Sequence, residues 1–223
     1  MVRQTSSLSR NVAPAQRLGA RVYEQVKSQI LSGYYAPGEW LPVDDLCRTF
    51  GVSRQPVMES MRRLSGDWLV QIVPQVGCRV AQYDQQALVD YIRTVGDLEG
   101  EVAALAATRR TSEQLEDLAA ITRELQEVTS FGDETRQLTR DYHGLVLEMA
   151  HSEVLQQVCE QLWDLGDFAW GIILASGTPA PHADGEERDH ITRLSAAIEA
   201  QDPELARSAA KEWLIADLAP SPR

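Results

Sequence analysis

The sequence predicts a mainly α-helical protein in two parts, with three helices and a β-hairpin in front and an all-α bundle behind. Three observations predict this order. Apolar residues recur at spacings of three and four over most of the 223 residues. The stretch at residues 69–80 has short β-branched runs separated by turn residues. From about residue 84 onward, no stretch has the convincing pattern of a strand.

The front part begins with polar residues 1–16, which offer little to bury and predict a flexible arm. A first helix is expected over about residues 17–32, where apolar side chains recur every four residues, and Gly33 can end it. Residues 35–38 predict a turn, because they contain Pro followed by Gly. A short second helix is expected over Val43–Phe50.

The stretch after Gly51 predicts a tight turn that leads into a third helix. Gly51 can take the left-handed backbone that ends the preceding helix. Ser53 can cap the new helix, and Pro56 falls in its first turn, where a missing N–H costs little. One face of this helix is expected to be apolar and buried, and it comprises Val57, Met61, Leu64 and Trp68.

Two strands are expected next, over residues 69–73 and 78–80, with a turn between them. Three helices followed by such a hairpin is the winged helix-turn-helix plan. Helical periodicity then continues in six stretches, with a loop at residues 176–185. We expect three regions: an arm at 1–16, a winged helix-turn-helix domain at 17–82, and an all-α domain at 84–219.

Composition indicates a soluble cytoplasmic protein. The apolar runs are too short to span a membrane, and the polar, basic N-terminus does not resemble a secretory signal. Cys47, Cys78 and Cys159 are far apart and odd in number, which favours reduced thiols.

The net charge of −12 is unevenly distributed. Residues 1–80 hold 10 Lys and Arg against 6 Asp and Glu, whereas residues 81–223 hold 11 against 27. A basic part joined to an acidic part favours nucleic-acid binding by the first, because only that part has to meet phosphates.

The third predicted helix carries a second stripe that suits the major groove of DNA. Arg54, Met58 and Arg62 recur every four residues, with Gln55 beside them. The alternative is an ordinary surface helix whose arginines only face water.

The sequence strongly resembles the GntR family of bacterial transcription regulators over nearly its whole length. The front pattern runs through residues 30–41, 50–57 and 74–80. The back half resembles the FadR-type effector domain, called FCD, through the segments around Glu99, His143 and His190. A run this long in fixed order is highly specific.

The resemblance implies a mechanism and partners. A homodimer would place its two recognition helices in successive major grooves of a pseudo-palindromic operator. A small organic acid, alone or with a metal, would bind inside the helical domain and change operator affinity. Many relatives repress genes for the catabolism of the compound that they sense.

The DNA contacts carried over by the resemblance differ in role. Arg54, Gln55 and Arg62 are the best base or phosphate contacts, and Met58 replaces an arginine of relatives and could touch a thymine methyl. Relatives also often have a different residue near Asp44, so the operator sequence stays open. The remaining expected contacts are to phosphate or backbone, from Ser53, Arg63, Gly77 at the wing tip and Arg79.

The metal site of relatives is incomplete here. His143 and His190 match two of its four ligands, but Thr139 stands where an aspartate is usual and Trp213 where a third histidine is usual. Two imidazoles rarely hold Zn²⁺ or Ni²⁺ alone. The alternative is that both histidines bind an effector or lie in the core.

An effector carboxylate without a metal would need a positive group, and arginine is the best-shaped donor. Arg93, Arg140 and Arg193 are the candidates by position. Trp163, Trp170 and Trp213 could form apolar walls, or could simply fill the core.

Three functions follow, of which a ligand-responsive repressor is preferred. The second is a metal-dependent enzyme centred on His143 and His190, which the missing ligands and the absence of a nucleophile motif disfavour. The third is a helical interaction module without DNA binding, which Met58 and Asp44 slightly favour.

Overall fold

The computed structural model describes residues 14–128, 133–175 and 186–216. The chain divides after Gln82 into two compact units, and each is described by itself. Within the described residues, no helix has the length and apolar character needed to cross a membrane. The predicted loop at 176–185 and most of the predicted arm at 1–16 lie outside these residues.

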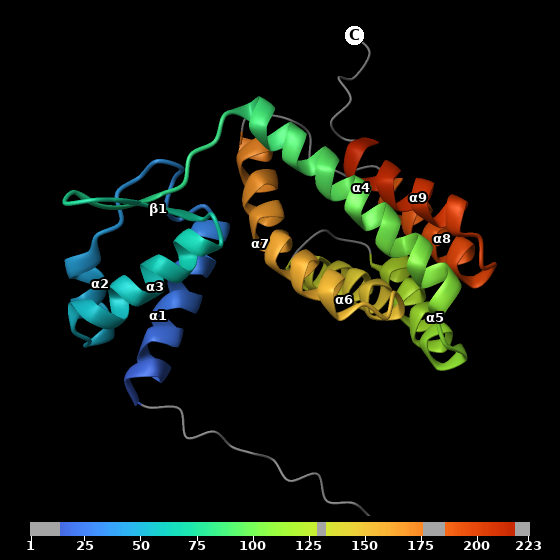
Figure 1. Ribbon diagram of the computed structural model, residues 1–223, viewed down its shortest axis with the longest axis horizontal. Helices are drawn as coiled ribbons and strands as arrows, with labels where there is room; N and C mark the ends of the chain where they lie inside the picture. Colours follow the sequence, from blue (N-terminus) through green and yellow to red (C-terminus); the bar gives the residue numbers. More distant parts are fainter. Residues whose placement is uncertain (1–13, 129–132, 176–185, 217–223) are drawn as a thin grey trace, which may run out of the picture. The chain divides into compact units, whose positions relative to one another are not determined.

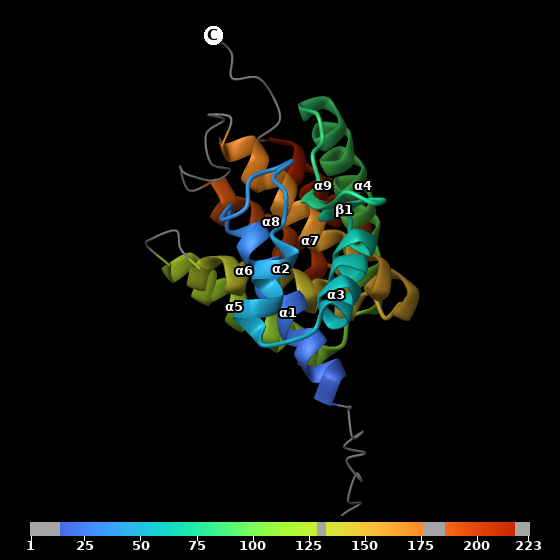
Figure 2. The same cartoon turned by 90° about the vertical axis from the view of Figure 1, so that its left-hand side faces the viewer.

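The first unit is a set of three helices followed by an antiparallel hairpin, as the sequence predicts (Figures 1 and 2). Helix α1 begins earlier than expected, because proline is well tolerated in a first turn. The strands pair with Val70 opposite Val80, and Trp40 forms an extra bridge to Arg79. The elements are α1 (Pro14–Leu31), α2 (Val43–Phe50), α3 (Arg54–Gly66), β1 (Val70–Val73) and β2 (Gly77–Val80).

Helix α3 packs along α1 and also contacts α2. Val57, Met61 and Leu64 on its inner face are fully buried, as their spacing predicts. Ser60 is buried as well, and its hydroxyl donates to the carbonyl of Gly19 on α1 at 2.8 Å. Helix α3 is therefore fixed to the core by one face.

The prediction that Trp68 continues this buried stripe is wrong. Helix α3 ends at Gly66, and Trp68 follows in a left-handed backbone conformation with 42% of its surface exposed. Leu69 takes the buried position instead. Ser53 stands at the N-cap position as expected, but its side chain makes no capping hydrogen bond.

Helices α4 to α9 are the regular elements of the second unit over its described residues (Figure 1). Helix α4 is the central element and contacts four other helices, which are α6, α7, α8 and α9. Side-chain caps stand at the start of helices in this unit: Thr111 forms a capping box with Gln114, and Asp202 accepts from the amide of Leu205 at 3.0 Å. The helices are α4 (Gln85–Arg109), α5 (Ser112–Glu127), α6 (Asp133–Met149), α7 (Glu153–Ala175), α8 (Glu186–Glu199) and α9 (Pro203–Ala216).

Candidate functional site

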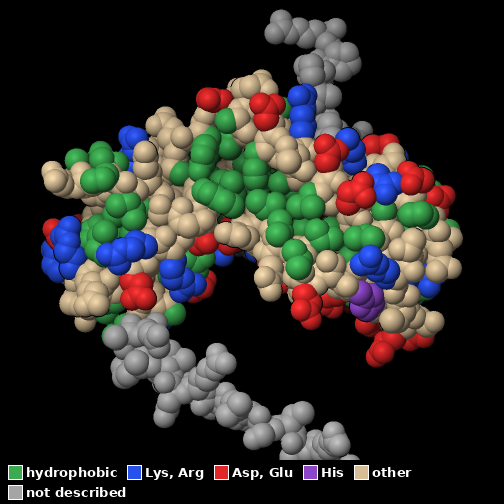
Figure 3. All heavy atoms as spheres, viewed as in Figure 1, with side chains coloured by type: hydrophobic (Ala, Val, Ile, Leu, Met, Phe, Trp, Pro, Cys, Tyr) green, Lys and Arg blue, Asp and Glu red, His purple; other side chains and the backbone are tan. Residues whose placement is uncertain are grey.

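The exposed face of α3 carries the polar side chains that the sequence singled out. Arg54, Gln55 and Arg62 are exposed, and Met58 is half-buried between them and the core. Figure 3 shows blue basic side chains prominent over the first unit, whereas red carboxylates gather over the helices of the second. Donors at the N-terminal end of an anchored helix can reach base edges in a major groove.

Arg54 is held by a carboxylate of the neighbouring helix. Its Nη1 donates to Oδ1 of Asp44 on α2 at 2.6 Å, although both side chains are largely exposed. An exposed ion pair of this kind contributes little to stability. The pair sets the Arg54 guanidinium beside Asp44 and so links α3 to α2.

Arg63 is exposed to solvent, and its guanidinium also contacts Tyr23 on α1. Its guanidinium is 3.9 Å from the ring centroid of Tyr23, whose hydroxyl donates to Asp67 at 2.7 Å. This stacking ties α3 to α1 and gives Arg63 a structural role beside the expected phosphate contact.

The hairpin presents Arg79 near its tip. The Nε of Arg79 donates to Gln71 across the strands at 2.8 Å, and the guanidinium lies 5.8 Å from the Trp40 ring centroid. Gly77 closes the turn, and Val76 within that turn is mostly exposed. Both the helix and the hairpin of the first unit therefore present arginines to solvent.

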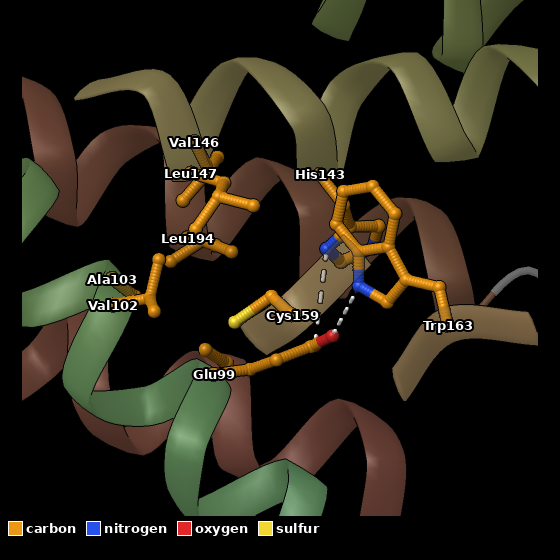
Figure 4. Close-up of a pocket in the computed structure, with 10 residues that line it drawn as sticks. Glu99, Val102, Ala103, His143, Val146, Leu147, Cys159, Trp163 and Leu194 are labelled. Atoms are coloured by element: carbon orange, nitrogen blue, oxygen red, sulfur yellow. Dashed lines mark hydrogen bonds and ion pairs between the residues drawn. The ribbon is translucent and has the colours of Figure 1, made fainter. Parts of the chain in front are cut away.

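The second unit contains a small cavity of about 20 Å³, drawn in Figure 4. A carboxylate from α4, an imidazole from α6 and an indole from α7 are its polar lining groups, and the remaining lining is apolar except for a thiol. The lining residues are Glu99, Val102, Ala103, His143, Val146, Leu147, Cys159, Trp163, Leu194 and Ala210. A volume of this size holds about one water molecule.

Glu99 is the charged group at this cavity. Its Oε1 accepts from the indole N–H of Trp163 at 3.3 Å, and its Oε2 lies 4.0 Å from Nδ1 of His143 (Figure 4). Burial raises the pKa of the Glu99 carboxyl to about 7, and the hydrogen bond from Trp163 offsets part of that rise. Burial also raises the pKa of the Cys159 thiol, to about 11, so this thiol stays protonated.

Comparison with known families decides the identity of the chain. The model for bacterial regulatory proteins of the gntR family matches residues 18–80. The model for the FCD domain matches residues 90–216, which is more than half of the chain. The chain belongs to the GntR family. It is a transcriptional regulator with an N-terminal DNA-binding module and a C-terminal FCD domain.

Individual relatives agree with this assignment. The GntR-family chain is 25% identical to the HTH-type transcriptional repressor GlaR of Escherichia coli over 199 residues, covering 86% of this chain and 90% of GlaR. It is 27% identical to the uncharacterized regulator YdhC of Bacillus subtilis over 149 residues, or 66% of each chain. The solved structure of E. coli McbR/YncC superposes with a TM-score of 0.69 at 25% identity, covering 90% and 95% of the chains.

The expected effector residues of this GntR-family regulator are only partly brought together. His143 lines the cavity, whereas His190 is buried on α8 and does not line it. Thr139 lies on α6, half-buried, one turn before His143 and outside the lining. The side chain of Trp213 lies outside the described residues.

The arginines expected to meet an effector carboxylate do not line the cavity. Arg93 is exposed on α4, and Arg193 is exposed and pairs with Glu212 at 3.1 Å. Arg140 lies closer, 6.0 Å from the Trp163 ring centroid, but it pairs with Asp167 and, at 3.6 Å, with Asp164.

The described residues do not fit a metal ion. Across residues 14–128, 133–175 and 186–216, His, Cys, Asp and Glu side chains nowhere form a group of three that could hold one. Glu99 and His143 meet at the cavity, while His190 is placed elsewhere in the core. The described residues at this cavity therefore do not supply the ligand set of a Zn²⁺ or Ni²⁺ site.

Trp163 lines the cavity as one of the expected apolar walls, whereas Glu99 was not among the residues that the sequence indicated for the ligand. The available signal was position: Glu99 lies four residues after Val95 and three before Val102, on the apolar stripe of its helix. An ionisable side chain on a buried stripe is a candidate for function.

Proposed function

We propose that the first unit binds an operator with α3 in the major groove and that the helical unit controls this binding through a ligand. The observation that carries the proposal is the division of α3 into two faces. One face is fixed by fully buried Val57, Met61 and Leu64, and the other presents Arg54, Gln55 and Arg62. Regions 17–82 and 84–219 then serve as the DNA-binding and the effector-binding and dimerisation domains.

The finer parts of the proposal follow from the family plan. A homodimer with two copies of α3 would read a pseudo-palindromic operator in successive major grooves. The relative GlaR is named a repressor, which supports repression relieved by a small organic ligand. The resemblance favours an organic acid of a catabolic operon. We place the ligand at the cavity beside His143, and the protein in the cytoplasm with its DNA.

We propose binding rather than catalysis at this cavity. The family and the named relatives are transcriptional regulators. Among the described lining residues, Cys159 is the one with a thiol, and burial keeps that thiol protonated, which disfavours a nucleophilic role. A turnover screen with candidate ligands that showed product formation would favour the enzyme alternative.

The test is the affinity of the protein for DNA from upstream of its own gene, measured by fluorescence anisotropy. Arg54→Ala should weaken operator binding by about 1–3 kcal/mol and relax base preference at one position. Arg123→Ala is the matched control, because Arg123 is exposed on α5 of the other unit. Equal affinities for Arg54→Ala and the wild type would contradict the assignment of α3.

A further inference from the structure

We infer that the ligand of the cavity presents a positively charged amine to Glu99, with an apolar body against the surrounding side chains. This inference rests on the proposed function, because it concerns the site through which the regulator is controlled. It differs from the organic acid that the family resemblance favours. The contacts, charges and size of the cavity carry it.

The first observation is the free acceptor of Glu99. Its Oε1 accepts from Trp163, but its Oε2 is fully buried and accepts no hydrogen bond from the described residues. Nδ1 of His143 lies 4.0 Å from this oxygen, which is beyond hydrogen-bond distance. A buried carboxylate oxygen in this position gains most from a donor that carries positive charge.

The second observation is the charge around the cavity. The described lining contains neither lysine nor arginine. Three of the basic side chains on the surrounding helices are already paired with other carboxylates of the unit. These pairs are Arg140 with Asp164 and Asp167, Lys211 with Asp97, and Arg207 with Glu101. A ligand carboxylate would therefore meet Glu99 without a compensating cation from these residues.

The third observation is the lining itself. Trp163 directs its indole N–H at Oε1 of Glu99, which leaves Oε2 for a ligand, and the rest of its ring adds apolar lining. Leu147, Leu194 and Val146 provide apolar contact on the other side (Figure 4). The cavity of about 20 Å³ admits an ammonium group, and the rest of the ligand has to displace these apolar side chains.

The experiment uses the full-length protein and three probes that share one carbon skeleton. These are butylamine, butan-1-ol and butyrate, with methylammonium as a probe of the head group alone. At millimolar probe, the melting temperature should rise by about 2 °C or more with butylamine, because a ligand of the native state stabilises it. The rise should be smaller with butan-1-ol and absent with butyrate. A larger rise with butyrate than with butylamine would overturn the inference, and so would no rise with either amine.

Glu99→Gln tests the residue, since it removes the charge and keeps the shape. This variant should bind butylamine at least about ten-fold more weakly than the wild type, which corresponds to 1.4 kcal/mol. Glu116→Gln, at an exposed position on α5, is the matched control and should bind as the wild type does. Unchanged amine affinity in Glu99→Gln would overturn the inference. If Glu99→Gln fails to fold, the comparison of butylamine with butyrate on the wild-type protein still tests the inference.

The two proposals fail separately. Operator binding by the ligand-free protein and its loss in Arg54→Ala test the DNA-binding function without any ligand. If the amines stabilise the protein through Glu99 but no operator is bound, the cavity assignment stands and the regulatory function fails. If the operator is bound but butyrate is the stabilising probe, the regulatory function stands and the amine assignment fails.

Discussion

At the scale of single residues, Glu99 places an ionisable group where burial opposes its charge. Its folded pKa is about 7, whereas its ordinary value is 4.5. A raised folded pKa means that the protonated form is preferred in the native state. The resulting stability is fully present below the ordinary pKa and is lost as the pH rises through the interval from 4.5 to about 7.

Replacing Glu99 by Gln should therefore change stability in a pH-dependent way. At about pH 8 the Glu99→Gln variant should be more stable than the wild type, by on the order of 1–3 kcal/mol, because the buried charge is gone. At about pH 4.5 the two should differ little, since Glu99 is then protonated and resembles the amide. Urea denaturation at both pH values measures this. An equal difference at both would show that Glu99 titrates normally in the native state.

Asp44 offers a second residue-scale prediction. Asp44→Ala should leave the free energy of unfolding within about 0.5 kcal/mol of the wild type, because the ion pair with Arg54 is exposed. Operator binding should change more, in base preference beside the Arg54 contact, since the guanidinium loses its orienting partner. Binding to a panel of single-base operator variants measures this. An unaltered preference would mean that Asp44 does not orient Arg54 on DNA.

At the scale of elements, α4 and α9 approach closely through small residues. Gly100 on α4 faces the backbone of Arg207, and a Cβ there would lie 3.0 Å from that carbonyl oxygen. Ala103, Ala206 and Ala210 are buried on the same two helices. Because small side chains let the two backbones come together, a larger side chain at this crossing must push them apart.

A pair of glycine substitutions tests this crossing. Gly100→Ala should lower the free energy of unfolding by about 1–3 kcal/mol, since backbone and packed side chain have to move. Gly144→Ala, in the interior of α6, should instead raise it by about 0.4–1 kcal/mol, because an added Cβ there meets nothing within 4 Å. Thermal or urea unfolding of both variants measures whether the free energy of unfolding falls for Gly100→Ala and rises for Gly144→Ala. Equal effects would contradict the close α4–α9 contact.

The sequence predicts the elements well and their tertiary surroundings less well. Helical periodicity locates every helix from α1 to α9, because one buried face repeats regularly along each of them. The same spacing placed Trp68 in the stripe of α3, since periodicity does not reveal where a helix stops. Glu99 and the ion pairs of Arg140 depend on contacts between helices distant in sequence, which a single sequence does not specify.

At the scale of the whole molecule, charge is divided between the two parts of the chain. The first 80 residues carry an excess of basic side chains, and the remainder carries a large excess of acidic ones. Attraction to phosphate is therefore confined to the part that holds α3 and the hairpin. The acidic part should repel DNA and limit binding at random sequences.

This division predicts a strong dependence of operator affinity on salt. The logarithm of the binding constant should fall linearly with the logarithm of salt concentration, by about 0.9 per phosphate contact. Arg79→Ala should reduce the slope by about 1 and weaken binding to all sequences alike, as expected for a phosphate contact. Anisotropy titrations over a range of salt concentrations measure the slope and the affinity for the wild type and for Arg79→Ala. A slope unchanged in Arg79→Ala would remove the hairpin from the phosphate contacts.

The tight cavity has a consequence for the speed of the response. The cavity has space for little more than one water molecule, so a larger compound does not fit unless the lining side chains move. The side chains around it must first part or yield, so that internal motion, and not diffusion, governs how fast the compound is captured. The observed association rate should then reach a maximum at high ligand concentration. That maximum equals the rate at which the surrounding side chains move apart.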